Sequence, residues 1–199
     1  NNVSYLAECL ESFIHQPVNM EVIIILDGCT DGSAEIAEQY RQAYSFVTVI
    51  NSNNQGPGYA RNQGIRLARG RYLFFLDSDD TIIEPDLALM IAEGDRQGVD
   101  IIRGQIQVYS QLANVEYMDP GIYAFDGLSE TTGQILPAYE YFYQVLMAPW
   151  TPAAWASIYR RELIHKYDIF FTELYSVDDM LFLTDVYTSS LEAKVFVLG

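Results

Sequence analysis

The chain has 199 residues, half of them apolar, so it is long enough to form one globular domain with a sizeable core. Its 11 basic residues against 27 acidic residues give a formal net charge of −16, which argues against a general nucleic-acid-binding protein and against direct docking on anionic lipid. No stretch approaches the ~20 continuous apolar residues of a membrane-spanning helix, and we expect neither such a segment nor a signal peptide here.

The first part of the chain alternates between predicted helices and strands. Apolar residues spaced along one helix face predict an opening helix over residues 3–14. Apolar runs and the turn residues between them predict the next elements, with strands at 21–26, 46–50, 71–76 and 99–109 and helices at 33–43, 57–68 and 85–97. This alternation is typical of an α/β fold with a mixed, mainly parallel sheet that is flanked by helices.

After residue 109 the pattern is looser. Residues 110–137 are rich in turn-forming residues, and beyond them the sequence predicts helices at 139–147, 161–166 and 178–187 and strands at 154–159 and 193–198. No internal repeat divides the chain, so we expect a single domain over residues 1–199, with parts of about 1–109 and 110–199. The chain opens on a helix and stops beside a strand, from which we expect the natural protein to be longer at both ends.

Three aspartates follow one of the apolar strands. Asp77, Asp79 and Asp80 come directly after the apolar run Tyr72–Leu76. Carboxylates this close repel one another, and each pair costs on the order of a few kcal/mol at an intermediate dielectric. A hard divalent cation bound to phosphates would hold them together. The structural alternative is that Asp79 or Asp80 caps a helix.

Further candidate binding residues are predicted at the same edge of the sheet. Ligands of an open α/β sheet bind beyond the carboxyl ends of its strands, and Asp27 follows the strand at 21–26. The loop at 55–59 leads into a helix whose N-terminus offers free amide donors, with Arg61 near that end. Together these features suit a nucleoside diphosphate. Taken singly, Asp27 also suits a turn, and Arg61 also suits a solvated helix position.

Several motifs in one order resemble a known family. They are YLAECLES at 5–12, LDGCTDGS at 26–33, NQGPGYARNQG at 54–64 and FLDSDD at 75–80, with a weaker match of VDDMLF at 177–182. In order and spacing they resemble the catalytic domain of the inverting glycosyltransferases of family 2 over about residues 1–105. The resemblance implies the GT-A fold, a Rossmann-like sheet that binds a nucleotide-diphospho-sugar, here without its first strand. Leu26 and Cys29 depart from the family pattern, which has aspartate and serine there.

The resemblance assigns the donor site to residues of the first part, about 1–109. Asp27 would bind the nucleotide base, and Arg61 would lie near the base or the diphosphate. Asp77 and Asp79 would form the Asp-x-Asp motif, with Asp79 near the ribose and the metal. Asp80 is a further candidate metal ligand, and the implied cofactor is Mg²⁺ or Mn²⁺.

The same resemblance assigns the acceptor side to about residues 110–199. Asp179 would be the catalytic base, which takes a proton from the acceptor hydroxyl as that hydroxyl attacks the anomeric carbon from the far side, so that the configuration inverts. Its structural alternative is a cap on the helix at 178–187. Asp178, Trp150 and Trp155 are weaker candidates for contacts with the acceptor, although aromatic residues also serve as core.

The resemblance also implies partners and a location. The donor would be a nucleotide-diphosphate sugar, with a UDP-sugar favoured, and the acceptor a saccharide or lipid-linked saccharide of bacterial surface polysaccharide synthesis. Neither Cys9 nor Cys29 has the spacing of a disulfide framework or a metal site, so we expect free thiols and a cytoplasmic protein. Membrane association at the inner face of the plasma membrane would come from segments outside this chain.

Two other functions fit parts of the sequence. DSDDT at 77–81 matches the nucleophile motif of the haloacid dehalogenase-type phosphotransferases, with Asp77 as nucleophile and Lys166 as the lysine that such enzymes need. Leu26 and the absent first strand also allow a nucleotide-sugar-binding domain that has lost turnover.

Overall fold

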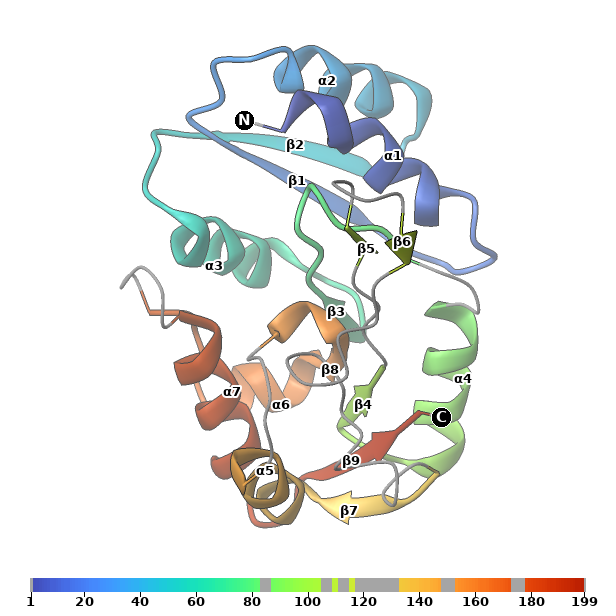
Figure 1. Cartoon of the computed structure of the whole chain (residues 1–199), viewed down its shortest axis with the longest axis vertical. Helices are drawn as coiled ribbons and strands as arrows, with labels where there is room; N and C mark the ends of the chain where they lie inside the picture. Colours follow the sequence, from blue (N-terminus) through green and yellow to red (C-terminus); the bar gives the residue numbers. More distant parts are fainter. Residues whose placement is uncertain are drawn as a thin grey trace.

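The computed structural model describes residues 2–82, 87–104, 109–110, 115–116, 133–147, 153–172 and 178–198. Figure 1 shows α1 and α2 at one end of the molecule, then a two-stranded sheet, and then a five-stranded sheet with its helices at the other end. Within these residues, no helix has the length and apolar character needed to cross a membrane.

The two-stranded sheet and the helices around it come from the first third of the chain. Its elements are α1 (Val3–Ile14), β1 (Val22–Asp27), α2 (Ser33–Ala43), β2 (Val47–Ser52) and α3 (Pro57–Leu67). β1 and β2 are parallel, with Val22 opposite Val47 and Asp27 opposite Ser52. The predicted alternation of helices and strands is therefore confirmed here, and Asp27 lies at the carboxyl end of its strand as expected.

The five-stranded sheet combines strands from distant parts of the chain. Its order is β3 (Tyr72–Phe74), β8 (Ser157–Arg160), β4 (Ile101–Arg103), β9 (Lys194–Val197) and β7 (Ile135–Pro137). The predicted mixed α/β fold is confirmed. Antiparallel pairs outnumber parallel pairs in this sheet, however, since β4 and β9 are the only hydrogen-bonded neighbours in it that pair in parallel. The reason is that β8 lies between β3 and β4 and is antiparallel to both, so these two strands run in the same direction without pairing.

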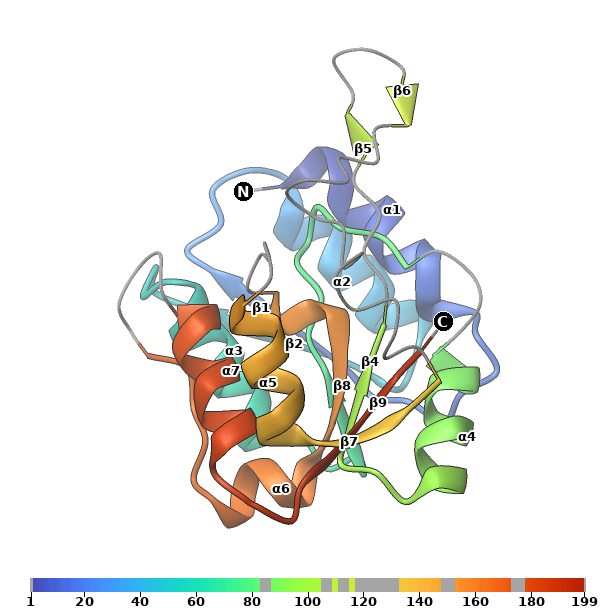
Figure 2. The ribbon, with the colours of Figure 1, turned by 60° about the horizontal axis from the view of Figure 1, so that its bottom comes forward.

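Helices cover both faces of the five-stranded sheet, as Figure 2 shows. The helix α4 (Leu87–Gln97) lies on one face, and α5 (Ala138–Met147), α6 (Arg161–Lys166) and α7 (Asp178–Thr188) lie on the other. Ile101 and Ile102 are both fully buried, but Ile101 packs with the residues of α5–α7 and Ile102 packs with those of α4. Successive side chains of a strand point to opposite faces, so one strand joins two hydrophobic cores.

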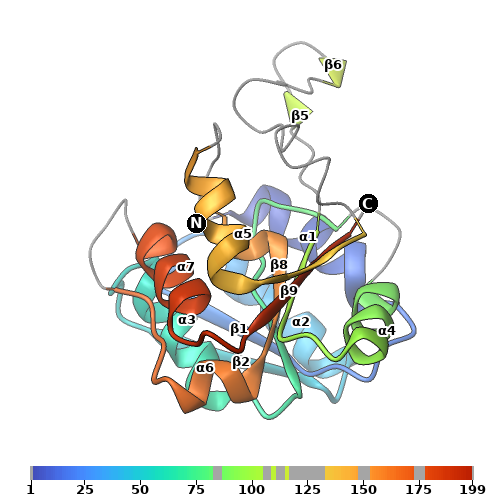
Figure 3. The ribbon, with the colours of Figure 1, turned by 90° about the horizontal axis from the view of Figure 1, so that it is seen from below.

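Two predicted strands differ most from the structure in their bounds. The strand predicted at 99–109 covers only Ile101–Arg103, and residues 105–108 lie outside the described part. The start of the strand predicted at 154–159 is instead the short 3-10 turn η2 (Ala154–Ala156), whose Ala154 N–H donates to a carboxylate of α7. A small antiparallel pair, β5 (Tyr109–Ser110) and β6 (Val115–Glu116), projects away from the rest of the molecule (Figure 3).

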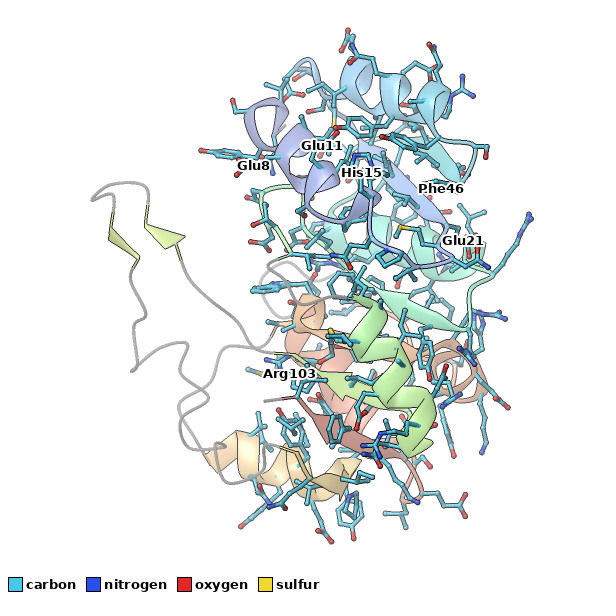
Figure 4. The ribbon with its side chains drawn as sticks, turned by 90° about the vertical axis from the view of Figure 1, so that its right-hand side faces the viewer. Glu8, Glu11, His15, Glu21, Phe46 and Arg103 are labelled. Carbon is cyan, nitrogen blue, oxygen red and sulfur yellow. The ribbon has the colours of Figure 1, made fainter. Side chains whose placement is uncertain are left out.

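One edge of β1 has no strand beside it among the described residues. The side chains of Ile23–Ile25 are only half-buried, although such an apolar run suits a strand that is covered on both sides. The carboxylate of Glu21, just before β1, accepts hydrogen bonds from the N–H groups of Arg69 and Gly70, just before β3, so the two sheets meet where these strands begin. Figure 4 shows Glu21 near this boundary and Arg103 within the five-stranded region.

Candidate functional site

The aspartates after β3 form a turn that α1 supports. The N–H of Asp80 and the thiol of Cys9 both donate to the carbonyl of Asp77, at 3.0 Å and 3.5 Å, and the N–H of Ile82 donates to the Ser12 hydroxyl at 3.1 Å. Burial, and then the nearby aspartates, raise the pKa of Cys9 to about 12, so its thiol stays protonated and remains a donor. The expectation of free thiols is confirmed. The contacts from Cys9 and Ser12 show that α1 fixes the backbone from which the carboxylates extend.

The side chain of Arg61 joins this turn to the start of α7. Its Nη2 donates to both carboxylate oxygens of Asp77, at 2.8 Å and 3.2 Å. Its Nη1 donates to Asp178 Oδ2 at 2.8 Å and to Asp179 Oδ1 at 3.0 Å. The Arg61 side chain is only 15% exposed, and those of Asp178 and Asp179 are 13% and 17% exposed, so solvent weakens these two ion pairs little. The Asp77 side chain is 41% exposed, so its pair with Arg61 is screened more. The fold thus brings together four of the residues that the sequence singled out.

Both carboxylate oxygens of Asp179 are held in place. Arg61 contacts Oδ1, and the N–H of Ala154 donates to Oδ2 at 3.2 Å, which leaves further lone pairs on each oxygen. Burial raises the pKa of Asp179 above its ordinary value, although Arg61 and the Ala154 N–H oppose that rise. The charges of Asp178 and Asp77 raise it further. A carboxylate with a raised pKa is a better proton acceptor than an ordinary aspartate, which suits a general base.

The helix α3 is fixed against the segment that precedes α7. The Asn62 side chain exchanges two hydrogen bonds with the backbone of Phe171, from Nδ2 to the carbonyl at 2.9 Å and from the N–H to Oδ1 at 2.8 Å. A Cβ on Gly58 would lie 2.3 Å from the carbonyl oxygen of Thr172, so only glycine allows this approach. These contacts determine where α3 presents Arg61.

Stacked aromatic rings lie beneath the carboxylates. The rings of Phe171 and Phe182 stack with centroids 4.0 Å apart, and Phe75 meets both edge-on at 5.1 Å and 5.6 Å. Phe75 comes shortly before Asp77, and Phe182 comes one helical turn after Asp179. The packing of these rings therefore sets the distance between the two acidic segments.

Asp27 lies at the N-terminal end of α3, on the other side of the 55–56 loop. Its carboxylate accepts hydrogen bonds from the N–H groups of Gln55 at 2.9 Å and Gly56 at 2.7 Å. Burial alone would raise the pKa of Asp27, but these backbone donors and the Ser52 side chain outweigh burial and the pKa is lowered. Asp27 is therefore ionised at neutral pH, and it shapes the loop from which α3 starts.

Asp79 and Asp80 are the carboxylates that remain for a cation. Burial, and then the charges of Asp77 and Asp79, raise the pKa of Asp80 to about 6. Hard oxygen donors with uncompensated negative charge fit Mg²⁺ or Mn²⁺. In the described part of the chain, no three acidic, histidine or cysteine side chains are grouped to hold a metal ion on their own. A cation here therefore also needs oxygen atoms from a bound substrate, as Mg²⁺ commonly does when it binds phosphates.

The residues predicted to contact the acceptor lie in different places. Trp150 lies outside the described residues. Trp155 is half-buried in η2, next to the residue whose N–H contacts Asp179, and Asp178 is paired with Arg61.

Sequence reasoning missed two groups of the site. One is the backbone N–H of Ala154, for which no side-chain pattern is informative. The other is the amide of Asn62, which is 5% exposed; a polar residue on the buried face of a predicted helix was the available signal.

Relatives of known sequence match most of the chain. EpsH of Bacillus subtilis (strain 168) is 33% identical over 186 residues, which are 92% of this chain and 52% of EpsH. The cholesterol galactosyltransferase of Borreliella burgdorferi is 31% identical over 172 residues, which are 82% of this chain and 47% of that protein. The chain therefore spans about half the length of the curated relatives it matches.

Solved structures share the fold. The crystal structure of S. aureus TarS 1–349 in complex with UDP aligns with a TM-score of 0.78 and 26% identity over 98% of this chain and 55% of that chain. The TarS complex with UDP-GlcNAc aligns with a TM-score of 0.75 and 25% identity. Residues 1–168 match the family model described as glycosyl transferase family 2. The chain belongs to glycosyl transferase family 2, with the GT-A fold that its motifs predicted.

Proposed function

We propose that this chain is the catalytic domain of a metal-dependent, inverting glycosyltransferase that moves a sugar from a nucleotide diphosphate to an acceptor hydroxyl. The observation that carries the proposal is the convergence of Asp77, Asp178 and Asp179 on one largely buried arginine, Arg61. Through Arg61, the Asp179 carboxylate, which has the raised pKa that suits a base, lies near the end of β3, where the Asp-x-Asp motif follows. That arrangement suits a donor and an acceptor that meet between the two acidic segments.

The donor side is proposed to consist of Asp27, Asp77 and Asp79 around the start of α3. Asp27 keeps lone pairs beyond the two amides that it accepts, and these suit the N–H of a nucleotide base. UDP and UDP-GlcNAc in the TarS complexes favour a UDP-sugar as donor. Asp79 and Asp80 would hold Mg²⁺ or Mn²⁺, whose charge would neutralise the diphosphate.

The acceptor side is proposed to lie at the start of α7, in the part of the chain beyond about residue 109. Asp179 would accept the proton of the acceptor hydroxyl, whose oxygen attacks the anomeric carbon opposite the departing diphosphate, so that inversion follows. Trp155, Trp150 and Asp178 are candidates for binding a saccharide or lipid-linked saccharide. We place the reaction in bacterial surface polysaccharide synthesis at the cytoplasmic face of the membrane, with no role for nucleic acid.

The two alternative functions fare differently against the family and the site. The phosphotransferase hypothesis loses its basis, since the chain belongs to another family and both oxygens of Asp77 accept hydrogen bonds from Arg61. A domain that binds a sugar nucleotide without turnover stays open to test, because Leu26 replaces the usual aspartate of the family motif.

Donor binding is tested by thermal shift of the full-length protein with UDP-, GDP-, CDP- and dTDP-sugars, each with and without Mn²⁺. A ligand at 100 times its Kd stabilises the protein by about 2.7 kcal/mol. We expect the largest rise with a UDP-sugar and Mn²⁺. No rise with any donor in the presence of the metal contradicts the proposal.

Turnover is tested with Asp179→Asn, which keeps the shape of the side chain but cannot take up the proton. We expect transfer to fall by at least about 100-fold while donor binding persists, since a positioned base contributes that much or more. Asp185→Asn, on an exposed position of the same helix, is the matched control and should transfer normally. Wild-type binding without any transfer or donor hydrolysis would favour the inactive domain.

A further inference from the structure

The surroundings of Arg61 differ from those of a typical phosphate-binding arginine. Four hydrogen bonds join its two terminal nitrogens to three carboxylates, and its guanidinium carbon lies 5.2 Å from the centroid of the Phe171 ring. Two of these carboxylates belong to α7 and one follows β3, more than 100 positions apart in the sequence. The aromatic rings of Phe75 and Phe182 hold these two segments together, and the planar guanidinium fork of Arg61 fixes how their carboxylates face one another.

Without the positive charge of Arg61, the three carboxylates around it would not stay close together. One guanidinium faces the carboxylates of Asp77, Asp178 and Asp179, which repel one another at this range when the cation is removed. Asp179 would then keep the hydrogen bond from the Ala154 N–H, and a single contact at one oxygen leaves the carboxylate free to rotate. The Arg61 contact at the other oxygen prevents that rotation.

The helix that carries Arg61 is itself rigidly placed. Asn62 and Gly58 fix α3 to the backbone at Phe171 and Thr172, close to the start of α7. Arg61 is thus presented to Asp179 from a helix that is anchored beside it.

We propose that Arg61 is a positioning residue that orients the Asp179 carboxylate toward the acceptor hydroxyl and holds it at a set distance from Asp77. The inference rests on the proposed function, in which Asp179 is the base. It replaces the role near the nucleotide base or diphosphate that the family resemblance implied for this residue.

The test uses steady-state kinetics of the full-length protein with Arg61→Lys and Arg61→Ala. A lysine ammonium cannot reproduce the two-nitrogen fork, so both variants should lose kcat, by about 100-fold for alanine and less for lysine. The KM for the donor should change much less than kcat, since Arg61 reaches the donor side only through Asp77. Arg66→Ala is the matched control, because Arg66 lies on the same helix, is exposed and stacks on the Phe170 ring. It should retain wild-type kinetics.

Chemical rescue separates positioning from a general loss of structure. Guanidinium chloride at millimolar concentration should restore part of the kcat of Arg61→Ala, but should not restore Asp179→Asn. If Arg61→Ala does not fold, the division between kcat and KM in Arg61→Lys decides the question. A large rise in donor KM with unchanged kcat would assign Arg61 to the donor and overturn the inference. That result would leave the proposed function intact, whereas a wild-type protein that neither binds nor transfers a sugar would refute the proposed function itself.

Discussion

β1 and β4 are similar in sequence and different in environment. Ile101 and Ile102 of β4 are completely buried, because strands pair with both edges of β4 and helices cover both faces of its sheet. Ile23–Ile25 of β1 are half-buried, with a strand on one edge among the described residues. The apolar run indicates a strand in both cases, but the depth of burial depends on neighbours that the run itself does not specify.

The two regions are consequently stabilised in different ways. The five-stranded region has a continuous aromatic and aliphatic core, whereas the two-stranded region adds polar anchors at Glu21 and Asp27 to a smaller set of buried apolar residues. The candidate site uses both, since Asp179 lies over the aromatic core and Arg61 comes from α3. The following substitutions should distinguish the two kinds of stabilisation.

The largest effect is expected from Phe182→Ala in the aromatic core. The ring is fully buried, so its loss should lower the free energy of unfolding by about 3–5 kcal/mol. The matched change in the two-stranded region, Ile24→Ala, should cost less than about 2 kcal/mol, because that side chain is only partly buried. Denaturant unfolding measures both, and equal losses would contradict the distinction between the regions.

Asn62→Ala should have an intermediate effect at the junction of the regions. It leaves the buried N–H and carbonyl of Phe171 without their partner, at a cost of about 1–3 kcal/mol in unfolding free energy. The neighbouring Gln63→Ala serves as control and should change stability little. If Asn62→Ala is as stable as the control, the amide does not fix α3, and the explanation for the placement of Arg61 fails.

Asp27→Asn should have the smallest effect and the clearest dependence on pH. The folded protein lowers the pKa of Asp27, so its carboxylate contributes stability above the unfolded-state value of about 3.9 and loses that contribution as the pH falls through the folded value. The carboxylate is only partly buried and is not part of a buried core, so we expect a loss of about 1 kcal/mol or less at pH 7. Thermal unfolding of both proteins from pH 7 to pH 3 should show the difference shrink, and a difference that grows toward pH 3 would contradict this assignment.

Local structure was predictable where local signals were strong. The helices at 33–43 and 161–166 have the predicted bounds, because apolar spacing and turn residues specify such elements from within the segment. The acidic ends of β1 and β3 were predictable for the same reason, since a strand followed by aspartates is visible in the sequence alone.

Long-range pairing was not predictable from the sequence. Nothing local indicates that β8 lies between β3 and β4, because hydrogen bonds between strands depend on backbone groups that every residue has. The partners of Arg61 were missed for a related reason. Its helix position indicates a cation near a strand end, but which of the 27 acidic residues it meets depends on the packing of α7.

One edge of β1 has no strand beside it in the described part of the chain, and this has a consequence for the behaviour of the 199-residue chain in solution. An apolar strand edge without a neighbouring strand is a template on which a second molecule can add backbone hydrogen bonds, so self-association of this chain should increase with concentration. A lysine at this edge, as in Ile24→Lys, opposes such pairing by charge and hydration. Light scattering at rising concentration should therefore show larger particles for the wild-type chain than for Ile24→Lys.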